Sequence, residues 1–215
     1  MDNIIQKAIN IRDHLKSGDD FPENPIDSSY NVIPPFTGKS EIKLIIVGQD
    51  PTVKESKSRR AIKMTLNLDK SNSLTRYVIG ICKDLGISLE NVYATNIFKY
   101  FYTIPPARTM NVLRKHLNLN IGLVREEIAD YNSVPVITLG EPVLELIANE
   151  SLNQKVRYYW GYDDKKYYML NAGENILERN LFPFPHQPSI SKVFYRTNIE
   201  RYIKYVYDSC HIFHN

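Results

Sequence analysis

A short apolar run that ends in a polar turn is the feature that most constrains this fold. Residues 42–47 are almost entirely aliphatic, and they are followed at once by Gly48, Gln49, Asp50 and Pro51. β-Branched side chains suit a pleated strand, and the glycine and proline close the run, so the sequence predicts a buried strand. In open parallel sheets, ligands bind where strands end at the carboxyl edge. We therefore expect Asp50 at a functional edge, where Gly48 lets the backbone approach a ligand.

The rest of the chain alternates between two hydrophobic periods. Helical spacing is found in residues 4–15, 74–85, 112–129, 143–147 and 194–207, and strand-like runs cover residues 92–98 and 134–139. This alternation predicts an α/β fold, a three-layer α/β/α sandwich around a mostly parallel four-stranded sheet. The 215 residues suit one hydrophobic core, and the composition does not change along the chain. We expect a single domain over residues 1–215.

Four connecting segments carry their own predictions. The basic loop of residues 54–60 could equally be a solvated face or a phosphate contact. Residues 61–68 could be a short strand or an irregular segment that lines the site. The Tyr-rich residues 156–175 favour an edge hairpin or a loop, although their aromatic rings could also stack on bases. Residues 181–191 contain three prolines around His186, two before it and one after it, which predicts a stiff loop with fixed side-chain directions.

Composition narrows the classes of protein. A hydrophobic fraction of 43% and a charged fraction of 24% exclude a disordered or fibrous chain. No apolar segment approaches the ~20 residues of a membrane span, and the N-terminal residues lack the apolar core of a signal peptide. We expect no membrane partner and a cytoplasmic location, or a nuclear one in a eukaryote or virus. A net charge of +3 permits a polyanionic partner without requiring one.

The cysteines and histidines do not suggest a metal or cofactor. Cys82 and Cys210 lie far apart, so neither a disulfide framework nor an iron–sulfur cluster is supported. The sequence of residues 210–214, Cys-His-Ile-Phe-His, could be imagined as a metal site, but no further ligands lie near it. We expect no metal, no cofactor and a monomer.

Three predicted strands end on candidate functional residues, which are Asp50, Asn96 and Gly140. An asparagine at the end of a strand can be satisfied by neighbouring backbone or can bind a ligand, and the sequence leaves both open. Gly140 precedes a helix that starts with Glu141 and Pro142, and the free N–H groups of such a start can seat an anion or phosphate.

These motifs resemble those of the uracil-DNA glycosylase superfamily. Residues 46–51, Ile-Val-Gly-Gln-Asp-Pro, are similar to its water-activating motif, and residues 186–191, His-Gln-Pro-Ser-Ile-Ser, are similar to its closing motif. Between them, Asn96 has the place of the strand-end asparagine that reads uracil, and Gly140 that of a loop which pinches the DNA backbone. Order and approximate spacing agree from Ile42 to Ile190.

The resemblance implies excision of uracil from DNA, the first step of base excision repair. Breaking the C1′–N bond passes through an oxocarbenium-like state, for which Asp50 would orient water and stabilise the positive sugar. His186 and the Gln49 backbone N–H would donate to the O2 of the departing base. Asn96 would accept from N3–H and donate to O4, a pattern that cytosine does not match.

The resemblance also implies contacts with DNA. A base inside a duplex is unreachable and must be flipped out. Ile190 would fill the vacated stack as an exposed wedge. Pro105, Gly140 and Ser189 would compress the backbone around the flipped nucleotide through contacts that are independent of base sequence.

Two base-site positions depart from the best-known branch of the superfamily. Thr52 stands where that branch has a tyrosine that excludes the thymine methyl, and Met64 is nearest to the position of its stacking phenylalanine. Thr52 is smaller, so a bulkier 5-substituted or deaminated base could enter. One alternative is therefore a catalytically weakened module that binds damaged DNA. Another is an unrelated enzyme on a nucleotide or sugar phosphate, against which the absence of a Gly-rich phosphate motif weighs.

Overall fold

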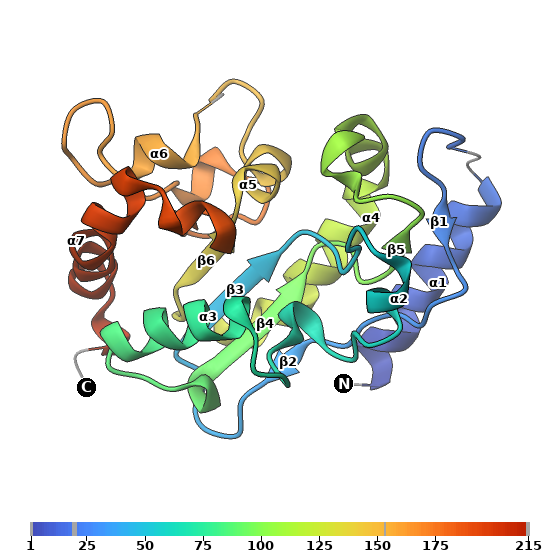
Figure 1. The fold of residues 1–215 in the computed structure, drawn as a ribbon, viewed down its shortest axis with the longest axis horizontal. Coiled ribbons are helices and arrows are strands. Elements are labelled where there is room, and N and C mark those ends of the chain that lie inside the picture. Colours follow the sequence, from blue (N-terminus) through green and yellow to red (C-terminus); the bar gives the residue numbers. More distant parts are fainter. Residues whose placement is uncertain (1, 19–20, 153, 214–215) are drawn as a thin grey trace.

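The computed structural model describes residues 2–18, 21–152 and 154–213 (Figure 1). Its helices are α1 (Asp2–Gly18), α2 (Ser56–Arg59), α3 (Ser73–Asp84), α4 (Met110–Ile128), α5 (Glu141–Ile147), α6 (Val156–Tyr159) and α7 (Val193–Ser209). Its strands are β1 (Ile26–Asp27), β2 (Phe36–Thr37), β3 (Leu44–Gly48), β4 (Val92–Asn96), β5 (Phe101–Tyr102), β6 (Val136–Leu139) and β7 (Leu181–Phe184). His214, the last histidine of the sequence considered as a metal site, lies outside the described residues.

The central sheet has five strands in the order β2-β4-β3-β6-β7. β4, β3, β6 and β7 are parallel to one another, and β2 pairs with β4 in the antiparallel direction. The predicted α/β fold with a mostly parallel sheet is confirmed, with one strand more than the predicted four. β2 is only two residues long, which is too short to leave an alternating pattern in the sequence.

β7 corrects the prediction of a loop at its position. The four residues Leu181–Phe184 are all buried and pair with β6, so that Pro183 lies opposite Thr138. Proline cannot donate to a ladder, but β7 is an edge strand with a neighbour on one side only, where a proline is tolerated. Because of its prolines, this strand was not predicted. It places His186 at the edge of the sheet where the carboxyl end of β3 also lies.

Helices cover both faces of the sheet (Figure 1). On one face lies α4, whose Glu127 accepts a hydrogen bond of 2.8 Å from Thr95 of β4, and α1 packs against α4. On the other face α3 packs against α7, and the Tyr77 hydroxyl of α3 donates to the Pro185 carbonyl at 3.2 Å. Every residue of β3 and β4 is buried between these layers, as the aliphatic run predicts.

Of the edge hairpin and the loop that the sequence favours, the Tyr-rich segment forms the loop. It contains α6 and a turn, and its pairing with β7 is a single isolated bridge between Leu170 and Leu181. Trp160 is fully buried, donates from Nε1 to the Pro183 carbonyl at 2.8 Å, and stacks on Tyr202 at 4.4 Å between ring centroids. Trp160 is therefore part of the core, whereas Tyr162 of the same segment is 50% exposed. No helix in the described ranges is long and apolar enough to cross a membrane.

Candidate active site

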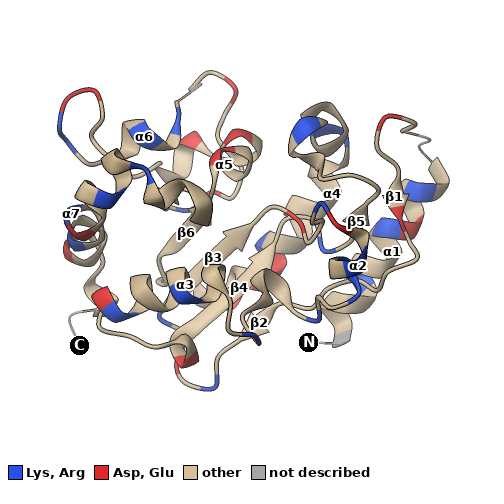
Figure 2. Cartoon of the chain, in the orientation of Figure 1, with Lys and Arg blue, Asp and Glu red and all other residues tan. Residues whose placement is uncertain are grey.

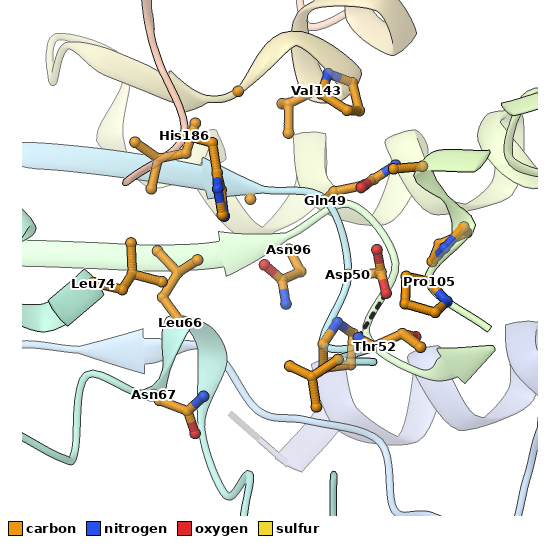
Figure 3. Close-up of a pocket in the computed structure, with 18 of the residues that line it drawn as sticks. Gln49, Asp50, Thr52, Leu66, Asn67, Leu74, Asn96, Pro105, Val143 and His186 are labelled. Atoms are coloured by element: carbon orange, nitrogen blue, oxygen red, sulfur yellow. Dashed lines mark hydrogen bonds between the residues drawn. The ribbon is translucent and has the colours of Figure 1, made fainter. Parts of the chain in front are cut away.

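A pocket of about 460 Å³ opens between the carboxyl ends of β3, β4 and β6 and His186, which lies two residues after the end of β7 (Figure 3). Its wall includes Gly48, Gln49, Asp50, Thr52, Leu66, Asn67, Leu74, Asn96, Pro105, Leu139, Gly140, Val143 and His186. β3 and β4 are parallel neighbours with Gly48 opposite Asn96, so these two strand ends open into the same space. The edge predicted from the sequence is thus a cavity that several distant segments share.

Asp50 lies in the turn after β3 and faces this pocket. Its Oδ1 accepts a hydrogen bond of 2.6 Å from the Thr52 backbone N–H (Figure 3). Burial raises the pKa of Asp50 to about 7, although the hydrogen bonds from Thr52 and the charge of Arg59 act in the opposite direction. Removing water from around a carboxylate disfavours its charged form. The carboxyl can therefore take up or release a proton near neutral pH.

The turn that follows β3 and carries Asp50 is held in place by Thr52 and Arg59. Thr52 Oγ1 accepts a hydrogen bond of 2.9 Å from the Tyr102 backbone N–H. Arg59 is only 4% exposed and donates to the carbonyls of Val53, Tyr102 and Thr103 at 2.8–2.9 Å. Arg59 is therefore a structural residue of the basic loop.

Asn96 ends β4 with its amide inside the pocket. The residue is 1% exposed, and its Oδ1 is buried without a hydrogen-bond partner among the described residues. A Cβ on Gly48 would lie 2.4 Å from this Oδ1, so glycine is required opposite Asn96. Neighbouring backbone does not satisfy the Oδ1, and this favours the alternative in which Asn96 binds a ligand.

His186 follows β7 and lies across the pocket from Asp50 (Figure 3). Gly140 has a φ of +98° and packs so closely that a Cβ there would lie 3.3 Å from the His186 Cβ. The Gly140 N–H donates to the Phe184 carbonyl at 2.8 Å, which joins the ends of β6 and β7. Desolvation lowers the pKa of His186, so the imidazole is neutral at neutral pH and can donate from one ring nitrogen.

Most of the predicted site residues line this one pocket, and three do not. Gln49, Asp50, Thr52, Asn96, Pro105, Gly140 and His186 are in its wall. Met64 is half-buried outside the wall, whereas Leu66, two residues later, lines the pocket. Ser189 and Ile190 lie in the 3₁₀ turn Gln187–Ser191.

The predicted exposure of Ile190 is wrong. Its side chain is half-buried and packs against the core, whereas Val193, three residues later, is 66% exposed. Ile190 lies within the 3₁₀ turn Gln187–Ser191, which rotates its side chain inward, and the sequence does not reveal this turn.

Residues 61–68 are irregular, which is one of the two predicted alternatives, and they supply three wall residues, Ile62, Leu66 and Asn67. Leu66 and Asn67 have φ values of +57° and +52°, within the 3₁₀ turn Thr65–Asn67. Asparagine tolerates a left-handed conformation, and this was the only sequence signal for the turn.

The pocket is not suited to a free phosphate. None of its lining residues is Lys or Arg, so a phosphate would meet the Asp50 carboxyl without a counter-charge. Glu141 occupies the first turn of α5 and accepts from the Val156 N–H, which places an acid at the helix start considered as an anion seat. In the described ranges, no three His, Cys, Asp or Glu side chains cluster so that they could hold a metal ion.

Comparison with known proteins agrees with this geometry. The search of curated proteins found no match to the chain. The family model of the uracil DNA glycosylase superfamily matches residues 34–208, which include all five strands of the central sheet and the whole pocket. The chain therefore belongs to the uracil-DNA glycosylase superfamily.

Proposed function

We propose that this protein is a monofunctional DNA glycosylase that hydrolyses the N-glycosidic bond of uracil in DNA. One observation carries the proposal: a carboxyl that titrates near pH 7 and a buried amide without a partner face one pocket from adjacent strand ends, at Asp50 and Asn96. The first can activate water and the second can recognise a base. Membership of the superfamily supports the coarse activity, and the buried Asn96 amide in the pocket supports uracil as the substrate.

Recognition rests on the Asn96 amide. Its Oδ1 accepts from N3–H of a flipped uracil, and its Nδ2 donates to O4. Cytosine carries an amine at C4 and no hydrogen on N3, so it leaves both amide groups mismatched. The cost of burying an unpaired polar group then disfavours cytosine in the pocket.

Hydrolysis rests on Asp50 and His186. The C1′–N1 bond breaks with its electron pair going to the base, and the ionised Asp50 stabilises the positive charge on the sugar. Water adds to C1′, and Asp50 takes its proton. Neutral His186 and the Gln49 N–H donate to O2, where the negative charge of the departing base collects. Neutral His186 is the form that its surroundings favour, whereas Asp50 acts in its ionised form, which is accessible at neutral pH because its pKa is about 7.

DNA is held by the rim of the pocket. We propose that Pro105, Gly140 and Ser189 contact the backbone of the flipped nucleotide. Exposed Lys54 and Arg108 directly follow the lining residues Val53 and Ala107, so their charges can reach flanking phosphates. Figure 2 shows further Lys and Arg residues on α2, α4 and α6. The enzyme acts as a monomer without a metal or cofactor in this proposal.

A base-release assay tests the proposal. Single- and double-stranded oligonucleotides that carry uracil, hypoxanthine, or thymine opposite guanine are incubated with the protein, and abasic sites are cleaved with alkali. We expect nicks at uracil, and a loss of about 10²–10⁴-fold in release with Asp50→Asn, the usual range for a general base. Asp164→Asn, at an exposed carboxyl outside the pocket, is the matched control. Unchanged turnover with Asp50→Asn refutes the mechanism.

The second candidate function is a binding module for damaged DNA. The observation that favours it is that the lining residues include no Phe, Tyr or Trp, and that Leu66 and Leu74 offer weaker stacking to a base. A saturable complex with uracil-containing DNA, together with no abasic product under any condition, would establish it in place of the enzyme.

A further inference from the structure

A cluster of aromatic and basic side chains lies outside the pocket, where α6 meets the start of α7. Tyr162 is 50% exposed, and its ring packs edge to face against that of Phe194 with 5.1 Å between the centroids. The Arg157 guanidinium lies over the Tyr162 ring, 4.5 Å from its centroid. Val193, the neighbour of Phe194, is 66% exposed. The mechanism proposed above uses none of these four residues, which we call the α6–α7 ledge.

The turn after α6 directs Tyr162 away from the core. Trp160 is fully buried, and Gly161 follows it with a φ of +73°. A Cβ on Gly161 would lie 2.9 Å from the Lys166 carbonyl oxygen, so this turn requires glycine. The Tyr162 N–H donates to the Arg157 carbonyl at 3.1 Å, which keeps the two residues side by side. The exposed ring is therefore held in a defined place by the backbone.

The ledge is joined to the rim of the pocket at two points. Gly140 lines the pocket, and both carboxylate oxygens of the next residue, Glu141, accept from the N–H of Val156 in α6 at 3.1 Å. Val193 begins α7, directly after the 3₁₀ turn Gln187–Ser191 and one further residue. Figure 1 shows α5, α6 and the start of α7 on the same side of the molecule. DNA that places a base in the pocket therefore passes beside the ledge.

The segments that form the ledge carry an excess of positive charge. Figure 2 shows Lys and Arg on α6 and near the start of α7. Asp163 is an exposed acid next to Tyr162, but four exposed cations outweigh it, and none of them forms an ion pair with a described residue: Lys155, Arg157, Lys192 and Arg196. Unpaired cations at this density favour a polyanion such as a nucleic acid.

An aromatic ring among cations suits an unpaired base better than a duplex. In a duplex, the neighbouring base pairs cover both faces of every base, so a ring on the protein surface meets only sugars and phosphates. In a single strand, a base can stack on the ring or on the arginine beside it, while the cations contact the phosphates on either side. Such stacking tolerates any base sequence.

We propose that the α6–α7 ledge is a binding site for single-stranded DNA, in which Tyr162 stacks on an unpaired base that flanks the nucleotide held in the pocket. Arg157 supports the ring and, with Lys155 and Lys192, contacts the adjacent phosphates. This inference rests on the proposed action on DNA, but the ledge binds a strand whether or not that strand contains uracil.

The test measures binding without base release. Fluorescence anisotropy gives the Kd of the protein for an oligothymidylate of about 20 nucleotides, which is longer than a typical single-strand site. We expect Tyr162→Ala to weaken binding about tenfold, the value of one stacked base. Tyr162→Leu keeps an apolar contact with Phe194 but has no ring, and it should lose as much. Tyr162→Trp should bind like wild type.

A control variant and a duplex of the same length complete the test. Leu119 is a 45% exposed hydrophobic residue of α4, outside the ledge, and Leu119→Ala should keep the wild-type Kd. Affinity for the duplex should be the same in wild type and Tyr162→Ala, because the ring has no unpaired base to stack on.

The outcomes separate the ledge from the proposed function. An unchanged Kd for the oligothymidylate in both Tyr162→Ala and Tyr162→Leu, or an equal loss for the duplex, overturns the single-strand site even if uracil is released. If wild type releases no uracil but binds the oligothymidylate in a way that depends on Tyr162, the proposed function is wrong and the ledge site stands.

Discussion

Two groups of buried polar side chains lie at the same edge of the sheet and differ in how the protein satisfies them. Behind Asn96, the side chains of Lys99 and Glu127 are 1% and 0% exposed and form an ion pair of 2.9 Å. Lys99 also donates to the Asn96 carbonyl at 3.0 Å, and Glu127 Oε2 accepts from Thr95. Although Glu127 Oε1 has no partner among the described residues, each charge faces its counter-charge.

The pocket shows the opposite arrangement. Asp50 makes no ion pair with any described residue, and burial raises its pKa to about 7. The Oδ1 of Asn96 is buried and has no hydrogen-bond partner among the described residues. The comparison teaches that the charges of Lys99 and Glu127, which support the end of β4, are neutralised by each other. The polar groups of the pocket, which would meet a substrate, are left without such partners. Such groups cost stability, so substitutions in the two regions should have opposite signatures.

The largest expected effect on stability is at the ion pair. Glu127→Gln leaves Lys99 buried without a counter-charge and should lower the free energy of unfolding by about 3–5 kcal/mol in denaturant titrations. The neighbouring Glu126→Gln breaks the exposed pair with Lys7 and should cost less than about 1 kcal/mol. Equal losses in the two variants would mean that the buried pair does not support the site.

The next effect is a pH-dependent gain of stability at Asp50. Because its pKa is raised from 3.8 to about 7, the folded state keeps a proton that the unfolded state has lost, and wild type loses stability as pH rises through this window. The Asp50→Asn variant does not lose stability in this way, because an amide does not titrate. The stability of the variant relative to wild type should therefore increase between pH 4 and 7 by on the order of 2–4 kcal/mol and then level off. A difference in Tm that does not change with pH contradicts the raised pKa.

A smaller effect is expected on base selection at Asn96. In Asn96→Asp, a carboxyl can accept from the N4 amine of cytosine and, when protonated, donate to N3. The uracil-to-cytosine ratio of kcat/KM should fall by roughly 10–100-fold, or about 1–3 kcal/mol. If the variant keeps a strict preference for uracil, another residue reads the base.

The smallest effect separates Ile190 from Val193. Ile190 packs against the core, so Ile190→Ala should mainly lower Tm, whereas the 66% exposed Val193 is available to enter a DNA stack. Val193→Ala should reduce release from duplex DNA about three- to tenfold more than release from single strands, or about 1 kcal/mol. If Ile190→Ala reduces base release from duplex DNA more selectively than Val193→Ala does, Ile190 is the wedge.

The comparison also explains which parts were predictable. The run before Gly48 is readable because strands covered on both faces consist of continuous aliphatic residues. Pro183 led to the prediction of a loop at β7, because proline is disfavoured inside strands. Proline is tolerated in an edge strand, and the sequence does not show that β7 is at the edge of the sheet. α4 continues through the three helix-disfavouring positions 118–120 because it buries Asn120, which donates to the Tyr100 hydroxyl at 3.0 Å. Tertiary contacts overrode local propensity in these two places.

The sequence by itself determined that Asp50, Asn96 and Gly140 end strands of an α/β sheet. Parallel strands present their carboxyl ends at one edge, so chain order and hydrophobic pattern suffice to bring these residues together. Only the tertiary structure decided that Arg59 is buried, that Asp50 titrates near pH 7, and that Asn67 lines the pocket. Burial, desolvation and the left-handed turn arise from contacts between segments far apart in the chain, and no local pattern of residues records them.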